Sequence, residues 1–110
     1  MQVTHSKIKD FVAVAIDGEV DLNSSPQLRK AFTEILSQGS SKIMINFVKV
    51  SYIDSSGLAT LIEMMQRLKK ENGQMRLVGM SDKIKSLFEI TKLDKLFLIY
   101  RSEEEALAAA

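Results

Sequence analysis

The chain has 110 residues, with 15 lysines and arginines against 14 aspartates and glutamates, so its formal net charge is +1. It contains no cysteine, which excludes disulfide bonds, thiol nucleophiles and thiolate metal sites. Charges of both signs are interspersed along the chain, and this balance argues against nucleic acid or an anionic membrane as a direct partner.

Length and polarity favour a single domain over residues 1–110 that works in the cytoplasm. A domain of this length buries roughly two-thirds of the surface of its unfolded chain, which is enough for one hydrophobic core. Residues 1–7 are polar and lack the apolar stretch of a signal peptide. The longest apolar runs have the length of a buried strand, far short of a membrane span.

The first part of the chain predicts a hairpin followed by a helix. Residues 2–8 form a weak strand, and residues 11–16 form an apolar strand expected to be buried on both faces. A polar loop over 17–21 follows. The helix starts at 24–26, where serine offers a capping hydroxyl and proline fits the first turn, and it ends at Gly39. Its apolar stripe consists of Leu28, Ala31, Phe32, Ile35 and Leu36.

The second part of the chain alternates strands with helices. A second long helix starts after Asp54 and ends at Asn72-Gly73, because apolar residues recur there at helical spacing. That stripe consists of Leu58, Leu61, Ile62, Met65 and Leu68. A short helix opens at Ser81, and a C-terminal helix opens at Ser102. The strands predicted in this part are residues 42–47, 75–79 and 96–100.

This order of elements predicts an α/β fold with a single mixed, mostly parallel sheet of four to five strands. The first two strands form an antiparallel hairpin, and the later strands alternate with helices, which requires crossover connections. The helices are expected to pack mainly on one face of the sheet.

Few residues point to catalysis. His5 is the only histidine, and it lies in the weak first strand, where a solvated surface histidine is more common than a catalytic base. The sequence has no metal-ligand cluster, no Gly-x-Ser-x-Gly element, no Walker motif and no Gly-x-Gly-x-x-Gly loop. We therefore predict no enzymatic activity, no catalytic residue, no cofactor and no metal.

Asp54 raises an alternative, because phosphoryl groups gather at the carboxyl ends of buried parallel strands. Receiver-type domains carry a phosphorylated aspartate there, with an acidic pair after the first strand and a lysine near the last. Here the acidic residues Asp17, Glu19 and Asp21 follow a hairpin that receivers lack, and Lys95 precedes its strand. The pattern therefore disfavours a receiver.

The most informative stretch is 50–58, where an apolar strand pattern gives way to a helical one. Ser55 and Ser56 lie at this junction, behind Asp54 and ahead of Gly57. A helix start presents unpaired backbone N–H groups and the positive end of the helix dipole, so it tolerates a phosphate. Serine before a helix is also a common cap, and this simpler interpretation stays open.

These residues resemble the STAS domain, and in particular the free-standing anti-sigma factor antagonists of bacteria. The matching segments are Gly18-Glu19-Val20-Asp21, Asn46-Phe47, Tyr52-Ile53-Asp54-Ser55-Ser56-Gly57-Leu58, Gly73, Leu77, and Ile84-Leu87-Phe88 to Leu93. The resemblance covers nearly the whole chain, and the Asp-Ser-Ser-Gly-Leu element is its most specific part.

The resemblance implies an anti-sigma factor antagonist that acts by partner switching. Ser55 is the expected phosphorylation site, with Ser56 as a minor alternative. An anti-sigma factor serine kinase would add the phosphate and a metal-dependent serine phosphatase would remove it. The unphosphorylated form, expected to be a monomer, would bind the anti-sigma factor and release sigma factor. The expected partner-binding residues are Asp21, Asn23, Tyr52, Asp54, Ser55, Ser56 and Gly57.

Physical chemistry supports such a switch. A phosphate brings about −1.5 to −2 charges, and backbone N–H groups at the helix start are expected to receive it without disturbing the fold. Burying that anion beside Asp54 at an interface would cost ~3–4 kcal/mol and weaken binding by roughly two to three decades.

Two alternative functions remain. One is a STAS module that is never phosphorylated and serves as a scaffold or accessory subunit, for example of a membrane transport complex. The other is a nucleotide-binding or catalytic domain.

Overall fold

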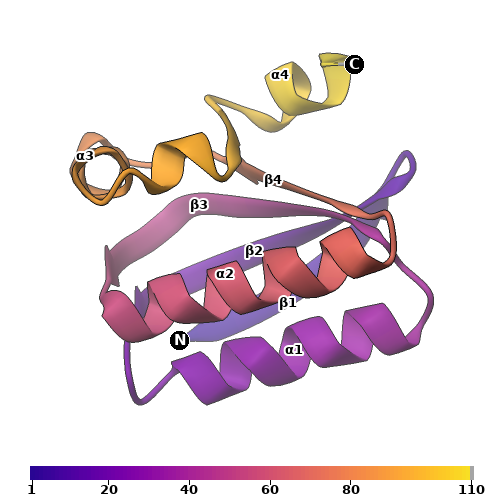
Figure 1. The fold of residues 1–110 in the computed structure, drawn as a ribbon, viewed down its shortest axis with the longest axis horizontal. Helices are drawn as coiled ribbons and strands as arrows, with labels where there is room; N and C mark the ends of the chain where they lie inside the picture. Colours follow the sequence, from indigo (N-terminus) through magenta and orange to yellow (C-terminus); the bar gives the residue numbers. More distant parts are fainter. Residues whose placement is uncertain (110) are drawn as a thin grey trace.

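In the computed structural model, which describes residues 1–109, a five-stranded sheet carries helices on both faces (Figure 1). The strands are β1 Gln2–Ile8, β2 Phe11–Val20, β3 Lys42–Ile53, β4 Gln74–Val78 and β5 Leu98–Tyr100. The helices are α1 Ser25–Ser37, α2 Ser55–Lys70, α3 Asp82–Ile90 and α4 Glu103–Ala108, with a 3-10 turn at Leu93–Lys95. The predicted fold class and the predicted order of strands and α-helices are confirmed.

The strands lie in the sheet in chain order, from β1 to β5. β1 pairs antiparallel with β2, and every later neighbour pairs in parallel. Val20 and Ile53 are register partners, so the carboxyl ends of β2 and β3 meet at one edge of the sheet. Receiver-type domains have the strand order 2-1-3-4-5, and the observed order therefore rules out that alternative.

The lengths of three strands differ from the predictions. The predicted polar loop at 17–21 is wrong, because β2 continues to Val20 and pairs there with β3, which runs to Ile53 rather than ending at 47. β5 starts at Leu98 rather than at 96, since the chain first forms the 3-10 turn. The long β2 and β3 bring both following loops to the same edge of the sheet.

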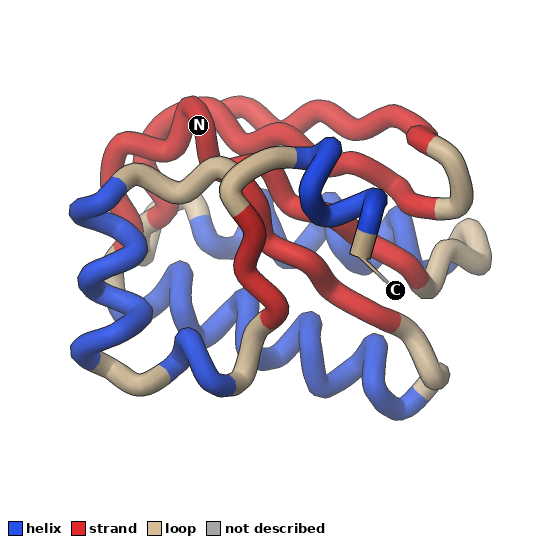
Figure 2. The backbone as a smooth tube through the Cα atoms, turned by 90° about the horizontal axis from the view of Figure 1, so that it is seen from above, coloured by secondary structure: helices blue, strands red, loops and turns tan. Residues whose placement is uncertain are grey.

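The long helices α1 and α2 lie side by side on one face of the sheet (Figures 1 and 2), as predicted. Their buried side chains join those of β2, β3 and β4 in one core. On the opposite face α4 packs over a smaller cluster, whose buried strand residues are Phe11, Met44 and Val78. The predicted burial of β2 on both faces is therefore wrong in part, because Ala15 lies beyond this patch and is exposed.

Arg76 anchors α4 to the sheet although it is a buried cation, only 4% exposed. Its guanidinium lies over the rings of Phe11 and Tyr100, at 4.9 and 5.7 Å from their centroids. Its Nη1 donates to the carbonyl oxygens of Ala106 and Ala109. Aromatic faces and carbonyl oxygens thus replace the water that a charged group otherwise requires.

Aromatic packing fixes α3 against the sheet. Phe88 is fully buried and meets the rings of Phe47 and Phe97 edge-to-face, with centroids 6.3 and 5.8 Å away. At the start of α3 the hydroxyl of Ser81 accepts a hydrogen bond from the N–H of Ile84. Figure 1 shows α3 at the same end of the molecule as the start of α2.

Candidate functional site

Asp54 caps α2, and this fixes the geometry of the serine junction. Its Oδ1 accepts hydrogen bonds from the backbone N–H groups of Ser56 at 2.9 Å and Gly57 at 3.1 Å. Two of the N–H groups that a helix start leaves unpaired are therefore already taken. The expectation that these groups would receive a phosphate needs correction, because a phosphate would have to displace the Asp54 carboxylate.

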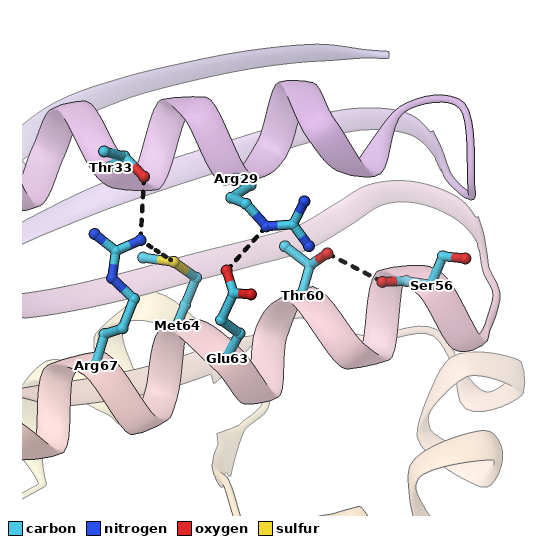
Figure 3. Close-up of polar contacts among 7 residues, drawn as sticks. All are labelled: Arg29, Thr33, Ser56, Thr60, Glu63, Met64 and Arg67. Carbon is cyan, nitrogen blue, oxygen red and sulfur yellow. Dashed lines mark hydrogen bonds and ion pairs between the residues drawn. The ribbon is translucent and has the colours of Figure 1, made fainter.

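Ser55 and Ser56 are the first two residues of α2 rather than its cap, so the capping interpretation is wrong for both. Ser55 is exposed, and its hydroxyl makes no hydrogen bond with any residue between 1 and 109. Ser56 is half-buried, and its carbonyl oxygen accepts a 3.0 Å hydrogen bond from the hydroxyl of Thr60 (Figure 3). Of the two serines, Ser55 therefore presents the more accessible hydroxyl to another protein.

Gly57 is buried where α2 crosses the ends of β2 and β3. A Cβ atom at this position would lie 2.7 Å from Cγ1 of Val20 and 2.7 Å from Cγ1 of Ile53. Such distances are far inside van der Waals contact, so only glycine lets the helix start approach the strands this closely. The structure therefore gives Gly57 a packing role beneath the exposed serine.

Two polar contacts connect the side chains of α1 and α2 (Figure 3). Arg29 of α1 forms a 2.9 Å ion pair with Glu63 of α2, and Arg67 donates a 3.1 Å hydrogen bond to Thr33. Both contacts are exposed, and exposed ion pairs contribute at most about 1 kcal/mol. The buried apolar side chains, rather than these contacts, set the position of α2.

The loop between β2 and α1 lies next to the serine junction, because it follows Val20 directly. Asp21 Oδ1 accepts hydrogen bonds from the N–H groups of Asn23 at 3.0 Å and Ser24 at 2.9 Å. The Ser24 N–H is the largest of the effects that hold the pKa of Asp21 below its ordinary value. The Ser24 hydroxyl accepts a hydrogen bond from the Asp21 N–H and donates one to the Glu19 carbonyl oxygen. It makes no hydrogen bond to the first turn of α1, so the predicted capping hydroxyl is wrong for Ser24.

An open groove of about 590 Å³ runs between the start of α2 and α3. Tyr52, Asp54 and Ser55 line it from one side. The remaining lining residues are mostly apolar and consist of Ser51, Ile53, Leu58, Lys83, Ile84, Ser86, Leu87, Ile90 and Thr91. Tyr52 is 45% exposed and Ile90 is 79% exposed. The groove thus offers apolar surface directly beside the Ser55 hydroxyl.

Five of the seven predicted site residues fall into two neighbouring groups, and Ser56 and Gly57 line neither hollow. Tyr52, Asp54 and Ser55 share the groove, whereas Asp21 and Asn23 line a separate hollow together with Met1, Glu19, Ser24 and Gln27. The α3 wall of the groove is missing from the predicted set. The sequence contains no specific signal for this wall, since Ile90 is a single exposed apolar residue outside the buried face of α3, and such residues are common on protein surfaces.

Two further properties concern metal and membrane. Among residues 1–109 no group of three or more histidine, aspartate or glutamate side chains is placed to hold a metal ion. None of the helices described here is both long enough and apolar enough to span a bilayer.

The STAS domain family model matches residues 2–106. The chain belongs to the STAS domain family. This STAS domain is similar to the anti-sigma-B factor antagonist of Staphylococcus aureus, with 33% identity over 94 residues that make up 86% of this chain and 87% of that relative. The family predicted from the sequence is thereby confirmed.

Solved structures show the same fold. A protein from Thermotoga maritima superimposes on this STAS domain with a TM-score of 0.90 at 24% identity, covering 96% of this chain and 91% of the other. SpoIIAA from Bacillus, solved in its phosphorylated form, gives a TM-score of 0.73 at 25% identity and covers 96% of each chain. Its unphosphorylated form gives 0.74 at 22%, covering 96% and 94%.

Proposed function

We propose that this STAS domain is an anti-sigma factor antagonist whose binding is switched by phosphorylation of Ser55. The observation that carries the proposal is the exposed Ser55 hydroxyl, which lies at the rim of an apolar groove and at a helix start capped by Asp54. The name of the Staphylococcus aureus relative and the phosphorylated form of SpoIIAA support it. In the proposed cycle the unphosphorylated chain binds the anti-sigma factor, and sigma factor is released.

The partner is also the proposed enzyme. An anti-sigma factor serine kinase transfers the γ-phosphoryl group of ATP to Ser55 Oγ, and the hydroxyl proton passes to a base of the kinase. The bond between the γ-phosphorus and the bridging oxygen breaks, and ADP leaves. A serine phosphatase hydrolyses the Ser55 phosphoester and restores the hydroxyl, so the chain itself performs no chemistry.

Electrostatics explain how one phosphate changes binding. The modified serine carries about −1.5 to −2 charges next to the Asp54 carboxylate. Because Asp54 already accepts from the N–H groups of Ser56 and Gly57, those two groups do not neutralise the added charge. Enclosing this anion in an apolar interface costs ~3–4 kcal/mol, which weakens binding roughly a hundredfold to a thousandfold.

The proposed partner-binding surface comprises the groove wall made by Tyr52, Asp54 and Ser55 and the adjacent loop with Asp21 and Asn23. These two groups lie on neighbouring loops at one edge of the sheet, since Val20 and Ile53 end paired strands. Ser56 and Gly57 lie beneath that surface and support its shape.

Incubation with ATP and a serine kinase encoded beside this chain tests the proposal. Mass spectrometry is expected to find one phosphate on Ser55, which Ser55→Ala abolishes and Ser56→Ala leaves in place. Ser55→Asp is expected to fold normally by circular dichroism and to bind the anti-sigma factor poorly. Failure of every co-encoded kinase to modify the chain would contradict the proposal and favour a scaffold or accessory role.

A further inference from the structure

The groove beside Ser55 joins two separate elements of the chain. One wall is the β3–α2 junction, and the other is α3, whose position is fixed by the packing of Phe88 against Phe47. Ser55 and Lys83 stand on these opposite walls, and both are exposed. Ser55 therefore shares a groove with a residue that follows it by 28 positions in the sequence.

The charges around the groove are few. Lys83 is its one cationic lining residue, and the other ionisable lining residues are Asp54 and Tyr52. The Asp54 carboxylate is engaged as the cap of α2. Lys83 forms no ion pair within the part of the chain that the structure describes, where the ion pairs are Arg29–Glu63 and Lys42–Asp10. Its ammonium group is therefore available to a new anion.

We propose that Lys83 is the counter-ion of phosphorylated Ser55 and that this pair closes the apolar groove between α2 and α3. The proposal rests on the proposed function for its biological meaning, because that function supplies the phosphate. The phosphate offers three strong acceptor oxygens, and the lysine ammonium has three donors on a flexible stem. Phosphorylation then does more than add charge to a docking surface, since the resulting pair lies across apolar side chains such as Leu58, Leu87 and Ile90.

Lys85 provides a matched control on the same helix. It is also exposed, but residues two apart on a helix do not face the same way. Lys85 lines a different hollow of about 720 Å³, on the side of α3 that faces β5. Neutralising Lys85 changes the net charge of the protein as much as neutralising Lys83 does. Comparing the two variants therefore distinguishes a local ion pair from an effect of net charge.

The test uses full-length protein carrying phosphoserine at position 55, installed by genetic code expansion, so that no kinase is needed. Phosphorus NMR over a pH series measures the second pKa of the phosphate, which is about 6 without a partner. K83Q is expected to raise this pKa by about 0.2 to 0.7 unit, as for an exposed ion pair, and K83R to restore it. K85Q is expected to leave it unchanged.

A second measurement on the same samples reports closure of the groove. In the wild type, phosphate is expected to shift the amide and methyl NMR signals of Leu87 and Ile90, and K83Q is expected to abolish those shifts. Equal pKa changes in K83Q and K85Q, or no change in K83Q, would overturn the pairing. These measurements test the Lys83 pair alone. The kinase experiment separately tests whether Ser55 is the modified residue.

Discussion

The backbone N–H of Asp54 donates a 3.1 Å hydrogen bond to the carbonyl oxygen of Val20. This bond ties the start of α2 to the end of β2, while the Asp54 side chain closes the first turn of the helix. Asp54 thus links strand, loop and helix directly before the exposed Ser55. Charge can be added at Ser55 while the surrounding backbone stays held on both sides.

The Asp54 cap predicts a graded response to substitution. Asp54→Ala removes the acceptor for the Ser56 and Gly57 N–H groups, and it should lower the free energy of unfolding by about 0.5–2 kcal/mol. Asp54→Asn keeps an oxygen in the same place and should lower it less. Urea denaturation of both variants measures the difference. Equal losses in the two variants would mean that the hydrogen bonds contribute little.

Gly57→Ala distinguishes helix propensity from packing. Propensity alone would make alanine stabilising by about 0.5–1 kcal/mol. The contacts at 2.7 Å with Val20 and Ile53 should reverse the sign, giving a loss of about 1–3 kcal/mol in the free energy of unfolding. Ala59→Ser, at an exposed position of the same helix, should change it by less than about 0.5 kcal/mol. A Gly57→Ala variant as stable as wild type would show that Val20 and Ile53 leave room for a Cβ atom at position 57.

The lowered pKa of Asp21 predicts a dependence of stability on pH. Hydrogen bonds from the Ser24 and Asn23 N–H groups favour the charged carboxylate in the folded state, so its folded pKa lies below the ordinary 3.8. The stabilisation is therefore present above pH 3.8 and is lost as the pH falls through the folded value.

The matching comparison uses Asp21→Asn, whose amide oxygen still accepts but carries no charge. Wild type should exceed this variant in free energy of unfolding at pH 7, and the gap should shrink as the pH falls below 3.8. Urea denaturation over this range measures the gap, and a carboxyl NMR titration of Asp21 checks the midpoint. A gap that stays constant with pH would contradict the assignment.

Local sequence patterns were sufficient to predict most of the fold. The apolar stripes of α1 and α2 and the hairpin before them depend on neighbouring residues, so periodicity located them. The extension of β2 through Asp17 and Glu19 depends instead on pairing with β3, a non-local contact that overrides the polar composition of the segment. The burial of Arg76 could not be predicted from the sequence either, because it requires Phe11, Tyr100 and α4 to come together.

The candidate site was predictable only on the β3–α2 side. Asp54 and Ser55 lie in one continuous sequence motif, and this motif alone predicts them as site residues. The α3 wall follows from the packing of Phe88, and no spacing in the sequence indicates that Lys83 shares a groove with Ser55. The capping role also went to Asp54 rather than to a serine, because its carboxylate reaches two N–H groups at once.

The affinity of the anti-sigma factor for this chain, with and without phosphoserine at position 55, tests the central claim most directly. Titration calorimetry should give a dissociation constant roughly a hundredfold to a thousandfold larger for the phosphorylated chain, while circular dichroism shows the same folded structure for both. Equal affinities, or a phosphorylated chain that loses its fold, would contradict a switch that acts through docking alone.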